Sequence, residues 1–118
     1  MSAIKSAAIL QTSSSNAAGS TTTSSTVNLS TAYYGTILAK VTNGTTAPTL
    51  PCSVTVNVSS DSATWRQYAQ QTAGLAASGV YSMAFDLPPS IMFAQVVFSG
   101  NTAQAVTVEA LVEYVTGI

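Results

Sequence analysis

Several segments of the chain alternate between mainly apolar and mainly polar side chains. The clearest is residues 52–59, where Cys52, Val54, Val56 and Val58 are separated by serine, threonine and asparagine. The same period of two recurs in residues 36–41, 80–87 and 106–114. Successive side chains of a β-strand point to opposite faces, so this period predicts strands that are buried on one face and wet on the other.

Turn-forming glycine, proline and asparagine residues separate these segments, and further strands are expected over residues 4–11, 25–29, 63–71 and 92–99. Residues 92–99 and 105–115 flank the short stretch 100–104, and this spacing indicates a β-hairpin. No segment has a convincing helical period. About eight short strands at regular spacing predict one all-β domain over residues 1–118, an antiparallel β-sandwich or a jelly-roll-like barrel.

Residues 12–25 differ from the rest of the chain. They are almost all serine, threonine, asparagine, alanine and glycine. Such a segment buries too little apolar area to offset the entropy lost on ordering, so we expect it to be flexible in isolation. Within the domain it is either a mobile loop or a segment that lies on a neighbour.

Charged residues are scarce, and this changes the picture of the surface. They make up 6% of the chain, with a formal net charge of −1, against about 25% in average soluble proteins. Either partners cover most of the surface, or hydroxyl and small side chains keep it neutral and wet. The mean hydropathy of +0.35 and the lack of charges to guard sheet edges favour a covered surface. We therefore expect a homo-oligomer, a dimer or trimer.

Composition also argues against several partners and compartments. Three scattered basic residues are too few to neutralise a row of phosphates, which argues against nucleic-acid binding. No apolar stretch approaches the roughly 20 residues of a membrane span. Residues 1–11 lack the apolar core of a signal peptide, so we expect the chain to be kept in a cytoplasm until assembly. The single Cys52 allows no internal disulfide and is expected to be an inert core thiol.

The residue types needed for catalysis are missing. The chain has no histidine and only four acidic residues, which excludes a Ser-His-Asp arrangement and argues against a zinc site. Glu109 and Glu113 share a strand face, but four residues place them roughly 13 Å apart, beyond the ~5–9.5 Å of glycosidase pairs. We interpret them as outward, solvated charges. The sequence predicts a non-enzymatic protein with no cofactor and no metal.

A few residues are candidates for contacts. Asp61 is expected to cap a hairpin turn, although loop oxygens around it could also ligate Ca²⁺. Trp65 is expected to pack in the core or an interface, in preference to binding a sugar. Tyr33 and Tyr34 are expected at a rim or an intersubunit contact. Arg66 lies on the strand face opposite Trp65, and its carboxylate partner is either in this chain or in a neighbour.

Three stretches resemble a known class of proteins: residues 41–48, residues 54–61 together with Trp65, and residues 98–110. In style and spacing they resemble small β-sandwich structural proteins of tailed-bacteriophage virions, particularly head decoration (capsid cement) proteins. The resemblance covers about two-thirds of the chain and implies a module that binds the major capsid protein lattice in a virion assembled in the host cytoplasm. It implies no catalytic or ligand residues.

Two other interpretations are retained. The chain is alternatively a tail or coat subunit of a phage-like particle, or a carbohydrate-binding or adhesin-like module. The latter would use Trp65, Tyr33, Tyr34 or Tyr68 as stacking platforms.

Overall fold

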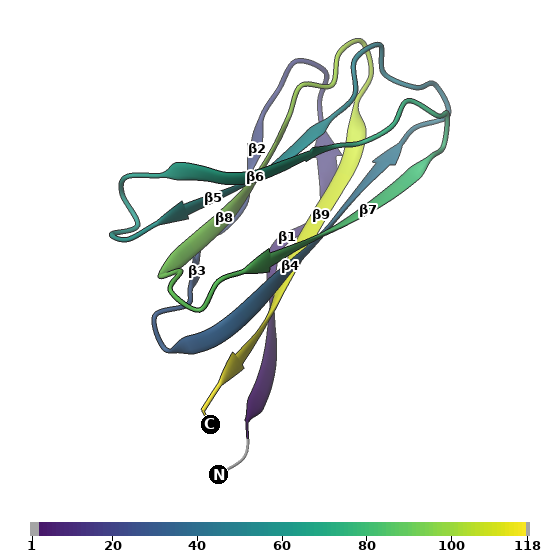
Figure 1. Ribbon diagram of the computed structural model, residues 1–118. Coiled ribbons are helices and arrows are strands. Elements are labelled where there is room, and N and C mark those ends of the chain that lie inside the picture. The colour runs from purple at the N-terminus through teal and green to yellow at the C-terminus, as the bar shows by residue number, and fades with distance from the viewer. Residues whose placement is uncertain (1–2, 118) are drawn as a thin grey trace.

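The chain folds into two antiparallel β-sheets packed face to face, as a computed structural model of residues 3–117 shows (Figure 1). No helix occurs in these residues. The strands are β1 (Ile4–Asn16), β2 (Thr22–Thr23), β3 (Val27–Asn28), β4 (Ala32–Asn43), β5 (Ser53–Ser59), β6 (Arg66–Thr72), β7 (Val80–Leu87), β8 (Phe93–Ser99) and β9 (Val106–Thr116).

The strand order is that of a jelly roll. Sheet A has the order β1-β9-β4-β7, and sheet B has the order β2-β8-β5-β6, with β3 also paired to β8. If β2 and β3 count as one interrupted strand, there are eight, and the first pairs with the eighth, the second with the seventh, the third with the sixth and the fourth with the fifth. This is one long hairpin rolled into two sheets. The predicted all-β sandwich is confirmed.

The hairpin expected from residues 92–99 and 105–115 is wrong. The first run is β8 in sheet B, and the second is β9 in sheet A, so the stretch between them crosses from one sheet to the other. Gly100 begins this crossing with a φ of +98°, a conformation that side chains disfavour. Spacing along the chain does not distinguish a hairpin from a sheet crossing. Consecutive strands β5 and β6 do form a hairpin.

The core lies between the two sheets and is made by the apolar side of the alternating strands. The alternation predicted these residues correctly: Val54 and Val56 are fully buried, and so are Val108 and Val112. Sheet A contributes Ile37, Ala39, Val41, Met83, Phe85, Leu87, Val106, Val108, Ala110 and Val112, and sheet B contributes Val54, Val56, Ala94, Val96 and Phe98.

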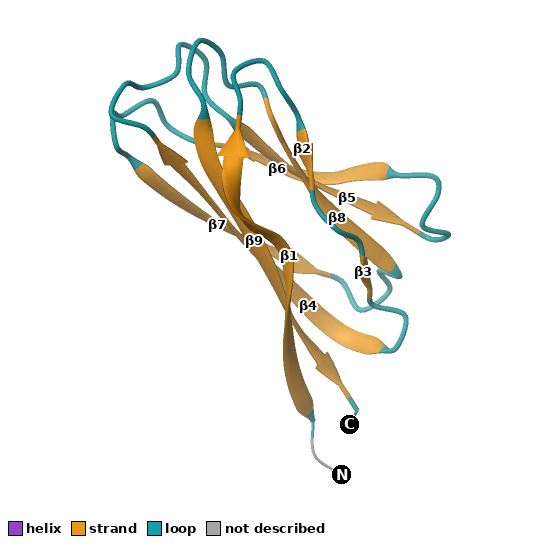
Figure 2. Cartoon of the chain, turned by 180° about the vertical axis from the view of Figure 1, so that it is seen from behind, coloured by secondary structure: helices purple, strands orange, loops and turns teal. Residues whose placement is uncertain are grey.

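The sandwich has two distinct ends (Figures 1 and 2). At the terminal end, Ile4 pairs with Thr116, so the two ends of the described chain lie side by side. The β3–β4, β5–β6 and β7–β8 turns are at this end. At the opposite end, here called the loop end, lie residues 17–21, 44–52, 73–79 and 100–105. Backbone hydrogen bonds such as Ser78 N to Gly44 O, 2.8 Å, join these loops to one another.

Two buried asparagines join the loops of the loop end. The side-chain amide nitrogen of Asn16 donates to the side-chain oxygen of Asn101 over 2.6 Å. The Asn101 amide nitrogen donates in turn to the carbonyl oxygens of Asn16 and Gln104. The Thr22 hydroxyl donates to the Asn16 side-chain oxygen. Both asparagines are buried, and these contacts satisfy the polar groups that burial removes from water.

Part of the serine- and threonine-rich segment 12–25 belongs to the sheets. Residues 12–16 complete β1, and Thr22 and Thr23 pair with β8. The hydroxyl of the buried Ser24 accepts a hydrogen bond from the Val96 backbone N–H over 2.8 Å. Hydrogen bonds therefore position the segment where apolar burial is lacking. Its flexibility in solution stays a prediction.

Tyr81 is seated between two glycines of the loop 73–79. A Cβ atom added to Gly74 would lie 2.5 Å from the Tyr81 ring, and one added to Gly79 would lie 2.7 Å from the Tyr81 hydroxyl. The Ala76 backbone N–H donates to that hydroxyl over 3.0 Å. The two glycines thus leave room for a ring that ties the loop to β7.

Candidate interaction surface

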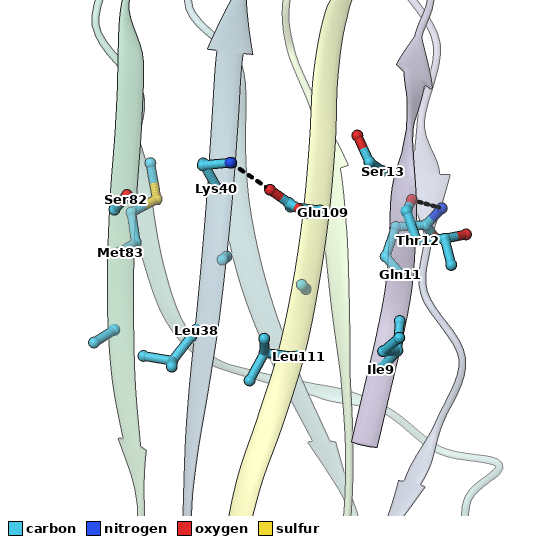
Figure 3. A pocket seen from close by; sticks show the side chains of 13 residues that line it. Ile9, Gln11, Thr12, Ser13, Leu38, Lys40, Ser82, Met83, Glu109 and Leu111 are labelled. Carbon is cyan, nitrogen blue, oxygen red and sulfur yellow. Dashed lines mark hydrogen bonds and ion pairs between the residues drawn. The ribbon is translucent and has the colours of Figure 1, made fainter. Parts of the chain in front are cut away.

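An apolar row crosses the outer face of sheet A, the face that points away from the core. It consists of Ile9 on β1, Leu111 on β9, Leu38 on β4 and Ala84 on β7. Each residue is directly opposite the next in the strand register. These four residues, here called the apolar row, therefore span the full width of the sheet. Figure 3 labels three of them, Ile9, Leu111 and Leu38.

The apolar row occupies positions where the alternation calls for polar side chains. Leu38 lies between the buried Ile37 and Ala39, so its own side chain points outward. Ile9 is 68% exposed and Leu111 is 36% exposed. A continuous apolar stripe across the solvent-facing side of a sheet is typical of a surface that another molecule covers.

One ion pair borders the apolar row. Lys40 on β4 and Glu109 on β9 are directly opposite in register, and their charged groups are 2.7 Å apart. Both side chains remain partly exposed. Together with Ser82, Gln11 and the apolar row they line a shallow hollow of about 570 Å³ on this face (Figure 3).

The other border of the apolar row is acidic. Glu113 and Asp86 lie two residues along their strands from the row, on the same face, with Thr36 between them. The Thr36 hydroxyl donates to an Asp86 carboxylate oxygen over 3.1 Å. Glu109 and Glu113 thus point outward, as the sequence predicted, but Glu109 is paired with Lys40.

The residues singled out from the sequence lie at the terminal end and do not form one site. Tyr33 and Tyr34 are exposed near the start of β4, at 45% and 59%. Trp65 is half-buried just before β6, outside the buried core. Arg66 is exposed and makes no ion pair within residues 3–117. Roles for these four residues as contacts stay predictions.

Two of these residues, Tyr34 and Arg66, line separate hollows. Tyr34 lines a hollow with Lys5 and Glu113 on sheet A. Arg66 lines another with Asp61 and Ile91, between the β5–β6 and β7–β8 turns.

The sequence reasoning missed the apolar row, although a signal was present. Leu38 and Leu111 occupy outward positions on their strands, where the alternation places polar residues. The inward positions of both strands are already apolar. An apolar residue in the outward register of a strand is such a signal. Its alignment with Ile9 and Ala84 depended on strand pairings that the pattern does not specify.

Asp61 caps the turn between β5 and β6, as expected. One of its carboxylate oxygens accepts hydrogen bonds from the backbone N–H groups of Thr64 and Ala63, at 2.8 and 2.9 Å, and from the Ser59 hydroxyl. These bonds stabilise the ionised form and lower the pKa of Asp61 to about 2. The carboxylate serves the turn itself.

Cys52 is fully buried just before β5, as predicted for a core thiol. Burial raises the pKa of this thiol to about 11, although a backbone hydrogen bond involving Ser99 opposes the shift. A thiol that stays protonated at neutral pH is a poor nucleophile.

Within residues 3–117, no cluster of three or more histidine, cysteine, aspartate or glutamate side chains could hold a metal ion. In the same described part of the chain, no helix has the length and apolar character needed to cross a membrane.

The strand order of the two sheets defines a jelly-roll β-sandwich fold. No family model matches it. The sequence also matches none of the curated proteins.

Solved structures share the fold at low sequence identity. The T13 particle of infectious bursal disease virus contains a chain that matches 97% of this one with a TM-score of 0.65 and 12% identity, over 31% of its own length. The PBSX exported protein XepA matches 96% of this chain, with a TM-score of 0.60, 14% identity and 38% coverage of its own length. The Yersinia pseudotuberculosis-derived mitogen matches 98%, with a TM-score of 0.54 and 8% identity, over 88% of its own length.

This chain therefore spans about a third of the length of the viral chain it matches. At these identities the likeness is one of fold.

Proposed function

We propose that the chain is a non-enzymatic structural protein of a virion, which decorates or cements a phage capsid by binding the major capsid protein lattice. The observation that carries this proposal is the jelly-roll topology of the two sheets. Jelly rolls recur in viral capsid domains. The similar fold in the particle of infectious bursal disease virus supports the proposal.

The surface chemistry suits a lattice protein. Only 6% of residues are charged, so contacts with neighbours are mainly neutral and involve little desolvation of charge. Many such contacts, each weak, add up on a lattice because each bound site raises the effective concentration at the next. The protein needs no catalytic group for this role.

The terminal end supplies candidate contacts with the lattice. Tyr33 and Tyr34 are exposed there, and Trp65 and Arg66 lie on the same end. Aromatic residues and arginine are enriched among residues that dominate binding energy at protein interfaces. We propose these four residues as contacts with the major capsid protein.

Particles purified from the natural source of this sequence test the proposal. We expect the chain to co-sediment with intact particles in a density gradient, and imaging should show it on the capsid exterior at regular lattice positions. A chain that stays in the soluble fraction and is absent from particles would overturn the proposal. A purified chain that forms tubes or closed shells on its own would instead assign it as a tail or coat subunit.

Variants locate the contact. We expect a Tyr33→Ala, Tyr34→Ala double variant to bind particles that lack the protein at least about tenfold more weakly. Leu50→Ala, an exposed change at the loop end, is the matched control and should bind normally.

The exposed tyrosines favour a second candidate, a carbohydrate-binding or adhesin-like module, because aromatic faces can stack on sugar rings. Jelly rolls also occur in lectin domains. A glycan array that gives a signal lost in the same double variant would favour this candidate. Particle binding without glycan binding would reject it.

A further inference from the structure

We infer that the outer face of sheet A is the self-association surface of this chain, and that two copies pack these faces together about a twofold axis. The inference does not depend on a role in a virion, because dimer formation is a property of the purified chain. It rests on the symmetry of the face, its charge pattern and its area.

The apolar row is complementary to itself. Strands β9 and β4 are central in sheet A, with β1 and β7 at equal distances on either side. A twofold axis nearly parallel to the strands and midway between β9 and β4 places Leu111 over Leu38 of the second copy. The same axis places Ile9, which is 68% exposed, over Ala84 of the second copy, the smallest member of the row. A large side chain thus meets a small one at each end of the apolar row, and leucine meets leucine at its centre.

The charges select this axis. It places Lys40 of each copy over Glu109 of the other, so the two existing ion pairs become a ring of four alternating charges. A twofold axis perpendicular to the strands through the apolar row would instead place Glu109 over Glu113 of the second copy. Like charges in contact disfavour that arrangement.

The geometry also suits ordinary sheet packing. Two sheets packed face to face keep their strands within about 30° of each other. An in-plane twofold axis tilted by about half that angle from the strands produces such a crossing. In such a twofold dimer each copy uses the same face, so neither copy has this face left to bind a third copy.

The area of the face predicts a reversible dimer. Four strands at about 4.8 Å spacing are roughly 19 Å wide, and nine residue steps are about 30 Å long. The face therefore has an area of roughly 600 Å². A standard interface buries about 800 Å² per partner, which is somewhat more. We expect dissociation on dilution.

Sedimentation velocity of the purified full chain, over a wide range of concentration, tests the inference. We expect a monomer–dimer equilibrium, or a larger oligomer built from such dimers. Leu111→Glu should weaken the association at least about tenfold, because it places two unpaired charges at the centre of the interface. Leu75→Glu is the matched control, since Leu75 is 48% exposed in the loop 73–79, and it should not change the association.

A charge reversal tests the axis and does not depend on the apolar row. Lys40→Glu alone and Glu109→Lys alone each place like charges together across the proposed interface, so each should weaken association at least about tenfold. The double variant, Lys40→Glu with Glu109→Lys, restores opposite charges in both pairs and should recover the dimer. Circular dichroism checks that every variant is folded.

Three results would overturn the inference. The first is a wild-type chain that stays monomeric throughout. The second is an oligomer that neither Leu111→Glu nor the single reversals weaken. The third is a monomer whose particle binding is lost in Leu111→Glu. That last result would assign the face to the lattice protein and leave the proposed function standing.

Discussion

Asp61 shows how one side chain organises a turn in this protein. Its carboxylate accepts three hydrogen bonds from the residues around it, and these hold the β5–β6 turn in place. A short polar side chain followed by serine, alanine and threonine is a turn signal in sequence. This site was predictable because all its partners lie within three residues.

The same carboxylate should make stability depend on pH. The pKa of Asp61 is about 2 in the folded chain. The pKa of an aspartate in an unfolded chain is higher, about 3.9. A lowered folded pKa contributes stability above the unfolded pKa, and that contribution is lost as the pH falls from about 4 to about 2. We expect the urea midpoint of the wild-type chain to fall over this range.

Asp61→Asn, which does not titrate, should flatten this part of the pH profile and lower the urea midpoint near neutral pH. Asp86→Asn, an exposed change on sheet A, is the comparison variant. Superimposable acid profiles for wild type and Asp61→Asn would contradict the assignment of this pH dependence to the turn.

At the scale of strands and loops, the structure depends on contacts between distant segments. Asn16 and Asn101 are 85 residues apart, yet they bond to each other and close the loop end. The alternation predicted most strands and their buried faces, because a strand's period of two is local. It did not predict which strands pair, and so it misread β8 and β9 as a hairpin and missed the alignment of Leu38 with Leu111.

The asparagine contacts should be a large contribution to stability. Asn101→Ala removes three hydrogen bonds and leaves the buried Asn16 amide nitrogen with the Ser20 carbonyl as its one remaining partner. We expect a loss of about 2–4 kcal/mol in the free energy of unfolding, measured by urea denaturation. Gln104→Ala is the control, because only its backbone carbonyl joins the network. A loss below about 1 kcal/mol for Asn101→Ala would show that the network adds little.

At the scale of the whole molecule, both sheets close over a single core, and Cys52 lies inside it. The thiol is fully buried and its pKa is about 11. The composition and the alternation of apolar residues predicted such a core. It did not indicate where an assembly surface would lie, since that depends on side chains from four strands that meet only after folding.

The buried thiol should report on opening of the molecule. We expect a thiol reagent to modify the native chain very slowly and the urea-unfolded chain at once, because reaction requires exposure of the thiolate. A second thiol placed by Ser60→Cys in the exposed β5–β6 turn should react at once in the native state. If native Cys52 reacted as fast as this exposed thiol, sheet B would open far more readily than its packing implies.

The pairing of Ile4 with Thr116 has a mechanical consequence. The start of β1 and the finish of β9 lie next to each other, and the hydrogen bonds between the two strands run perpendicular to them. A force that pulls the two chain termini apart therefore breaks these hydrogen bonds one pair at a time. The sandwich would thus unzip from its edge and would not be sheared as a block. A force applied to the two sheet faces, or to the loop end, does not separate β1 from β9 in this way.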